Sequence, residues 1–137
     1  MKLLQLTLFL CFSQLFFAQS SENGKKTTQP ALRFTVLEIE RQDIPYGSED
    51  LFVFEFKNTS KKAAVITNVQ TSCGCTAAER PETPIRKGKK GVIKVHYDTK
   101  RVGAFTKTIT VFSNVGDPIV LTIKGTVLTP SDSPVTN

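Results

Sequence analysis

Apolar and polar residues alternate with a period of two through most of the chain, and this pattern restricts the fold more than any other feature of the sequence. In the clearest case Phe52, Phe54 and Phe56 are separated by Val53 and Glu55. Successive side chains of a β-strand point to opposite faces, so such a segment is a strand with one buried face. The same pattern predicts strands within residues 32–36, 52–57, 63–69, 93–97, 105–111 and 119–124.

Residues typical of turns separate these segments, for example at positions 45–47, 58–60, 87–88 and 114–118. No segment has the periodicity of a helix. About seven to eight short strands in roughly a hundred residues predict an all-β fold, an immunoglobulin-like antiparallel β-sandwich. A small β-barrel is the alternative. The predicted core consists of Phe54, Phe56, Ile66, Val95, Tyr97, Ile109, Val111 and Leu121.

The start of the chain has the pattern of an export signal. Lys2 precedes an apolar stretch from Leu3 to Phe17, and this stretch meets the small residue Ala18. We predict a signal peptide at residues 1–18, cleaved after Ala18 or, alternatively, after Ser20. Polar residues follow too early for a membrane span, which needs roughly 20 apolar residues, so no span is expected after cleavage. The mature protein is therefore expected to be periplasmic or secreted.

Two segments without periodicity flank the predicted domain. Residues 19–30 are polar and are expected to form a flexible leader. Residues 129–137 contain two prolines and are expected to form a disordered tail. The sandwich is accordingly assigned to residues 31–128.

The protein is basic, with 18 Lys and Arg residues against 12 Asp and Glu and a formal net charge of +6. The densest basic segment is a predicted turn that contains Arg86, Lys87, Lys89 and Lys90. It is a candidate binding site for an anionic glycan or an acidic envelope protein. Alternatively, it is a solvated turn whose lysines protect edge strands. Nucleic acid is not an expected partner, because the chain lacks a recognition helix and stacking aromatics beside this segment.

Two cysteines, Cys73 and Cys75, remain after cleavage of the signal peptide. A disulfide between them closes a three-residue loop, for which chain entropy contributes only about 1.6 kcal/mol. Gly74 permits the kink that would bring the two sulfurs together. Three interpretations stay open: a local structural disulfide, a redox-active dithiol with Arg80 as the nearest cation in sequence, and a metal site. We expect the two cysteines to be joined to each other in the isolated protein.

The residues that catalysis usually requires are scarce. The single histidine, His96, is out of phase with Ile93, Val95 and Tyr97 and is expected to face solvent. The sequence contains no G-x-S-x-G elbow, no phosphate-binding loop and no ligand set for a catalytic metal. We therefore predict that the protein is not an enzyme and has no catalytic residues, metal ligands or cofactor.

Several motifs together carry a family resemblance. They are, in chain order, Phe-x-Phe-x-Asn-Thr from residue 54, Ser-Cys-Gly-Cys-Thr from residue 72, Val-Ile-x-Val-x-Tyr-Asp from residue 92 and Ile-x-Gly-x-Val from residue 123. This layout resembles the exported bacterial family of domains of unknown function numbered fifteen seventy-three. The resemblance implies an immunoglobulin-like sandwich similar to the major-sperm-protein and ASPM/SPD-2/Hydin type, without an established activity. The family's usual Pro-Gly is Lys87-Gly88 here, which makes this loop more basic than is typical.

These observations predict an exported, non-catalytic interaction module of the cell envelope. Immunoglobulin-like sandwiches commonly serve as binding scaffolds, which is an analogy at the level of the fold. The alternative is a thiol-disulfide redox or metal-handling protein that acts through Cys73 and Cys75.

Overall fold

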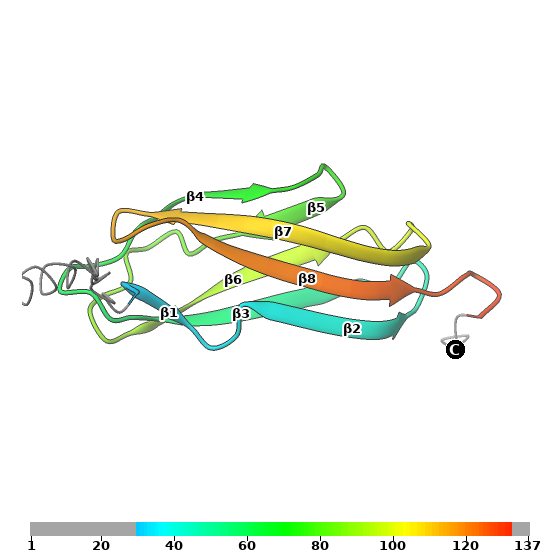
Figure 1. Ribbon diagram of the computed structural model, residues 1–137, viewed down its shortest axis with the longest axis horizontal. Coiled ribbons are helices and arrows are strands. Elements are labelled where there is room, and N and C mark those ends of the chain that lie inside the picture. The colour runs from blue at the N-terminus through cyan, green and yellow to red at the C-terminus, as the bar shows by residue number, and fades with distance from the viewer. Residues whose placement is uncertain (1–29, 133–137) are drawn as a thin grey trace, which may run out of the picture.

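The computed structural model describes residues 30–132, which form two β-sheets packed face to face (Figure 1). The strands are β1 (Leu32–Phe34), β2 (Glu38–Ile44), β3 (Leu51–Asn58), β4 (Ile66–Thr71), β5 (Thr76–Glu79), β6 (Lys90–Tyr97), β7 (Gly103–Ser113) and β8 (Ile119–Val127). One sheet has the order β1-β3-β6-β5 and the other has the order β2-β8-β7-β4. The all-β sandwich is therefore confirmed, and the barrel alternative is wrong.

Part of the predicted domain organisation falls outside the described residues. This applies to the signal peptide at 1–18, to the leader at 19–30 except its last residue, and to residues 133–137 of the tail. Those assignments stay predictions. Within residues 30–132, no helix is long and apolar enough to cross a membrane.

The core lies between the central strands of the two sheets. Phe52, Phe54 and Phe56 of β3 are fully buried, and across the ladder Phe52 lies opposite Val95 and Phe54 opposite Ile93. All eight core residues predicted from the alternation are buried. Burying one large apolar side chain contributes roughly 1.5–3 kcal/mol, so this cluster accounts for much of the driving force for folding.

The strand predicted within residues 32–36 is shorter in the structure. It ends at Phe34, because the chain crosses to the opposite sheet at residues 35–37. β1 pairs antiparallel with β3, whereas β2 pairs parallel with β8 in the opposite sheet. The β2–β8 pair is an exception to the antiparallel pattern, since the chain enters the second sheet without reversing direction. Val36 lies in the crossover and is 44% exposed, so its assignment to the buried face of a strand is wrong.

Two strands have no counterpart in the sequence prediction. β2 is mostly exposed and polar, and β5 is only four residues long. The weak strand predicted at 63–69 begins later, at Ile66, after a single bridge between Ala64 and Ile85. Alternation fails in these segments because they lie at or beside sheet edges, where few side chains need to be buried.

Candidate functional site

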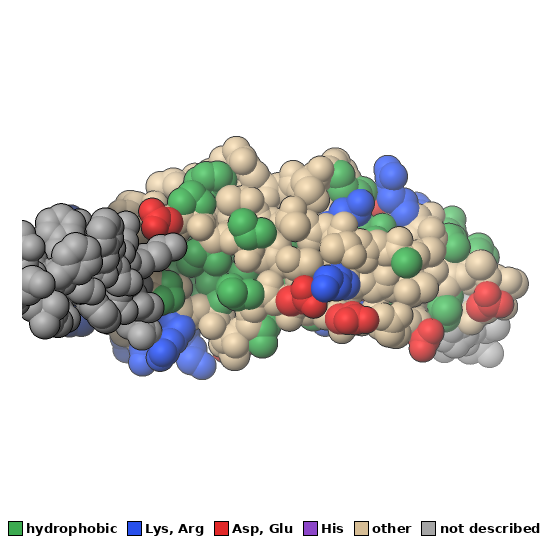
Figure 2. All heavy atoms as spheres, in the orientation of Figure 1, with side chains coloured by type: hydrophobic (Ala, Val, Ile, Leu, Met, Phe, Trp, Pro, Cys, Tyr) green, Lys and Arg blue, Asp and Glu red, His purple; other side chains and the backbone are tan. Residues whose placement is uncertain are grey.

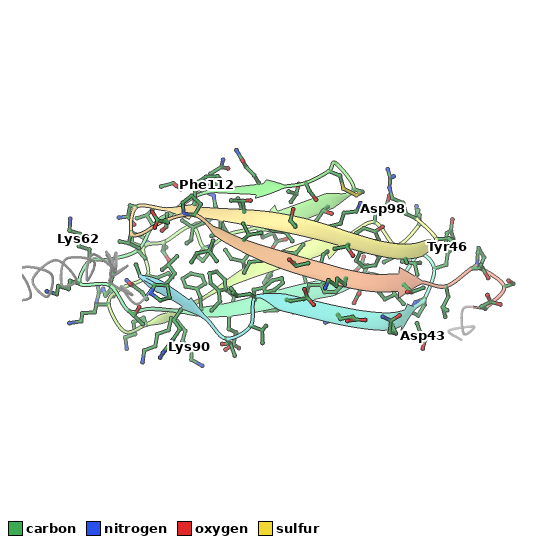
Figure 3. All side chains as sticks on the ribbon, in the orientation of Figure 1. Asp43, Tyr46, Lys62, Lys90, Asp98 and Phe112 are labelled. Carbon is green, nitrogen blue, oxygen red and sulfur yellow. A yellow bond between two sulfur atoms is a disulfide. The ribbon has the colours of Figure 1, made fainter. Side chains whose placement is uncertain are left out.

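The predicted basic turn lies at one end of the sandwich. Lys89 donates its backbone N–H to the carbonyl of Arg86 at 3.0 Å, which closes a four-residue β-turn. Gly88, the third residue of this turn, has a φ of 76°, and glycine adopts this angle at the least cost. Figure 3 places Lys90, the first residue of β6, at the same end as Lys62.

Asn58 joins the basic turn to the loop that follows β3. Its buried side-chain amide donates to the carbonyls of Lys62 at 2.7 Å and Ile85 at 2.8 Å, and its Oδ1 accepts from the backbone N–H of Ser60 at 2.9 Å. Its backbone N–H donates to the carbonyl of Lys89, and its carbonyl accepts from Gly88. One buried asparagine thus fixes two lysine-bearing loops side by side.

We call the resulting surface the basic end. Figure 2 shows lysine and arginine side chains gathered there, beside the start of β1. The basic end consists of Lys57, Lys61, Lys62, Arg86, Lys87, Lys89 and Lys90. Among residues 30–132, Lys90 is the one member of this set that forms an ion pair, with its Nζ at 3.5 Å from Glu55 Oε2. The other six cations keep their charge available for a ligand.

The structure brings Lys57, Lys61 and Lys62 next to the candidate residues of the basic turn, and the sequence had not named these three lysines as candidates. The turn residues Asn58, Thr59 and Ser60 were the signal for a loop there. That this loop meets residues 86–90 depends on hydrogen bonds between positions up to 27 residues apart, which no local pattern indicates.

Cys73 and Cys75 form a disulfide with a Cα–Cα distance of 5.4 Å, in the bend between β4 and β5. Both side chains are partly exposed. The bend joins the two sheets: the Ser72 N–H donates to the Thr108 carbonyl on β7 at 3.0 Å, and the Asp98 N–H donates to the Cys75 carbonyl at 3.0 Å. The expected pairing of the two cysteines is therefore present.

The structure shows what surrounds this pair at Gly74 and at Arg80. Gly74 does not have a left-handed φ, and a Cβ added to it would meet no atom within 4 Å, so the bend does not require glycine. Arg80 donates from its guanidinium to the Ile66 carbonyl at the start of β4, the end of that strand remote from the cysteines. Arg80 is therefore not placed to lower the pKa of a cysteine thiol.

The two candidate sites lie apart. The basic turn precedes Lys90 at one end of β6, and the disulfide bend contacts Asp98 just beyond Tyr97 at the other end. His96 is exposed, as predicted, with Nε2 at 3.2 Å from Glu79 Oε1. Within residues 30–132, no group of three or more His, Cys, Asp or Glu side chains is arranged to hold a metal ion.

The end opposite the basic end has an open hollow of about 620 Å³, whose lining includes Ser48, Asp50, Tyr97 and Lys100. The Asp50 carboxylate pairs with Arg41, whose guanidinium lies 4.8 Å above the ring of Phe52. Burial raises the pKa of Tyr97, the nearby Asp98 carboxylate acts in the same direction, and Arg101 opposes both. Three carboxylates and Lys100 line this hollow, and two of the carboxylates, Asp50 and Asp98, are each paired with an arginine.

Comparison with known proteins supports the fold. A family model described as a protein of unknown function, DUF1573, matches residues 32–127. No curated protein matches the sequence. The PapD-like domain 7 of human CEP192 is 8% identical with a TM-score of 0.59, and the match covers 82% of this chain and 97% of that domain.

Two bacterial structures are also similar. A protein of unknown function from Porphyromonas gingivalis W83 is 13% identical with a TM-score of 0.61, over 70% of this chain and 46% of the other. The VesB protease of Vibrio cholerae is 11% identical with a TM-score of 0.59, over 70% of this chain and 32% of the protease. The chain thus spans less than half the length of these two proteins, and the likeness concerns the fold alone.

Proposed function

The chain belongs to the DUF1573 family, and from its fold and its charge distribution we propose that it is a non-catalytic interaction module of the cell envelope whose basic end binds an anionic glycan. The observation that carries this proposal is the convergence of two lysine-bearing loops on the buried Asn58. A fixed group of like charges is costly to the folded state through self-repulsion. Binding an anionic ligand would offset that cost.

The shape of the basic end favours a polymer over a small molecule. Arg86, Lys87 and Lys89 are all exposed, on a turn that projects from the sandwich. Small ligands are usually held in concave, mostly apolar pockets with a few converging polar groups. An exposed row of cations is instead suited to a chain of regularly spaced carboxylates or phosphates, where affinity grows with the number of charges neutralised.

The proposal includes export of the mature protein, which the predicted signal peptide at residues 1–18 supports. Anionic polysaccharides are constituents of the envelope and its surroundings, so such a ligand and the protein would share a compartment. Amino-terminal sequencing of protein from cell fractions tests this part. A mature chain that begins near Gln19 or Ser21 is expected, and an intact Met1 on the purified protein would contradict export.

The binding test uses polygalacturonate as the anionic polymer and neutral dextran as the reference. Binding to polygalacturonate is expected at low ionic strength, and its affinity should fall as salt is added, because exposed charges are screened. The double variant Lys87→Glu/Lys89→Glu should weaken it at least tenfold, about 1.4 kcal/mol. Fluorescence anisotropy with labelled polymer measures the dissociation constants.

A matched control separates the site from the net charge. The double variant Lys100→Glu/Arg101→Glu makes the same charge change at the other end of the molecule, where both residues are exposed. Its dissociation constant for polygalacturonate should stay within about twofold to threefold of that of the unsubstituted protein, because salt screens a charge this far from the site. Equal losses in the two variants, or equal binding to dextran, would refute a site at the basic end.

A further inference from the structure

Hydrogen bonds on both sides hold the bend in which the Cys73–Cys75 disulfide lies. Ser72 and Thr108 exchange two hydrogen bonds, N–H to carbonyl at 3.0 Å and Thr108 N–H to Ser72 Oγ at 3.2 Å. On the other side, the Cys75 carbonyl accepts from Asp98 at 3.0 Å. The disulfide closes a loop of only three residues. The entropy that a disulfide removes from the unfolded chain grows with loop length, so this bond contributes little to the free energy of unfolding.

A buried hydroxyl group faces both sulfur atoms. Thr76 is only 6% exposed, and its Oγ1 lies 3.8 Å from the Sγ of Cys73 and 3.8 Å from that of Cys75. A hydroxyl can donate a hydrogen bond to a thiolate, and hydrogen bonds to the charged form lower a pKa. Either sulfur, once released as a thiolate, would therefore find a donor already in place.

A lysine follows the point on β7 where the pairing with β4 ends, next to the bend that contains Cys73. The regular β4–β7 pairing ends at Thr71 and Ile109, and Ser72 beyond it is hydrogen-bonded to Thr108, so Lys107 is the next residue of β7 on the side of the cysteine bend. Lys107 has the phase of the inward residues Phe105 and Ile109 and is only partly exposed. Lys107 takes part in none of the ion pairs among residues 30–132. A cation next to a cysteine lowers the pKa of its thiol.

From these three observations we propose that Cys73–Cys75 is an exchangeable disulfide that oxidises two thiols of a partner protein, an activity that goes beyond glycan binding and does not depend on it. Both sulfurs are partly exposed, and Cys75 is the one packed against the core. A thiolate of the partner therefore attacks Cys73 Sγ. The Cys73–Cys75 bond breaks, a mixed disulfide forms at Cys73, and Cys75 leaves as a thiolate beside the Thr76 hydroxyl.

The second step completes the exchange. The other thiolate of the partner attacks the partner sulfur in the mixed disulfide, and Cys73 leaves as a thiolate in the bend next to which Lys107 lies. The partner has then lost two electrons and two protons and carries a disulfide. Cys73 and Cys75 have gained the two electrons and take up two protons from solvent. One molecule thus oxidises one dithiol, and no further oxidant is required.

The test uses residues 19–137, the predicted mature chain, with reduced glutathione as the attacking thiol, and it follows the free thiols by alkylation and mass. Glutathione is expected to reduce the bond in the folded protein, with an unchanged far-UV spectrum. Thr76→Val should slow this reaction at least tenfold and raise the pKa of the released thiols. Thr76→Ser should restore both, because it keeps the hydroxyl.

Two further variants complete the design. Thr106→Val removes an exposed hydroxyl from the same strand as Lys107 and should react like the unsubstituted protein. Lys107→Gln should slow the reaction severalfold, and it keeps the proposal testable if Thr76→Val does not fold. A bond that glutathione leaves intact, or reaction rates that Thr76→Val and Lys107→Gln do not change, would overturn the proposal.

Discussion

Phe54 lies between the two sheets with no exposed surface, opposite Ile93 of β6. Phe54→Ala removes a buried ring and leaves a cavity, so the free energy of unfolding should fall by about 3–5 kcal/mol. Its neighbour Val53 points outward and is 40% exposed, so Val53→Ala should cost less than about 1 kcal/mol. Urea denaturation of the two variants measures both values. A loss below about 1 kcal/mol for Phe54→Ala would contradict its place in the core.

Tyr97 makes stability depend on pH in the alkaline range, because burial raises its pKa in the folded protein. In the unfolded chain a tyrosine loses its proton near pH 10, and in the folded protein Tyr97 does so at higher pH. Between the two pKa values the unfolded chain binds fewer protons, so the free energy of unfolding falls as pH rises. Below pH of about 9 this contribution is fully present.

Tyr97→Phe removes the ionisable group and keeps the ring that stacks on Phe105 at 3.7 Å between centroids. The unsubstituted protein should therefore lose more stability than Tyr97→Phe between pH of about 9 and 11. Denaturation midpoints measured at several pH values test this. Identical slopes for the two proteins would mean that Tyr97 has the same pKa in both states.

At the scale of the elements, Gly125 of β8 permits the close approach of β2. A Cβ on this residue would lie 2.5 Å from the Arg41 carbonyl oxygen and 2.9 Å from the ring of Phe105. Gly125→Ala must displace backbone as well as a packed ring, so a loss of about 1–3 kcal/mol is expected. Gly74→Ala makes the same change in open space and should alter stability by less than about 0.5 kcal/mol. Equal losses, measured by chemical denaturation, would contradict the close β2–β8 contact.

The alternation of apolar and polar residues failed to predict β2 and β5, and both are edge strands. A central strand such as β3 has one face in the core, and its burial pattern alternates strictly along the strand. β2 buries only Ile44 completely, and hydrogen bonds to β8 hold it in a strand conformation. Backbone pairing carries no sequence signature, so a polar edge strand is visible only in the folded sheet.

At the scale of the whole molecule, the two candidate sites lie at opposite ends. Figure 3 shows Lys62 and Lys90 at one end and Asp43 and Asp98 at the other. The basic turn and the disulfide bend are separated by the length of β6, seven residue steps or about 23 Å. Substitutions this far apart, without shared contacts, usually have independent effects.

Independence of the two ends is itself a prediction. The double variant Cys73→Ser/Cys75→Ser should bind polygalacturonate within about twofold of the unsubstituted protein, because it changes no group near the basic end. Conversely, Lys87→Glu/Lys89→Glu should react with glutathione at an unchanged rate. Anisotropy and alkylation kinetics on these variants provide the measurements. Coupling in either direction would show that the sandwich transmits changes between its ends.

The sequence by itself predicted the fold class, the central strands, all eight core residues and the pairing of Cys73 with Cys75, and the structure has all of them. These properties follow from local patterns, since a buried strand face must alternate and two cysteines this close can meet only within one bend. Only the tertiary structure decided the crossover at residues 35–37, the contact of the loop at residues 58–62 with residues 85–89, and the hydrogen bonds that join Ser72 to Thr108. Each of these depends on hydrogen bonds between distant segments, and such bonds form only when the complete sheets bring those segments together.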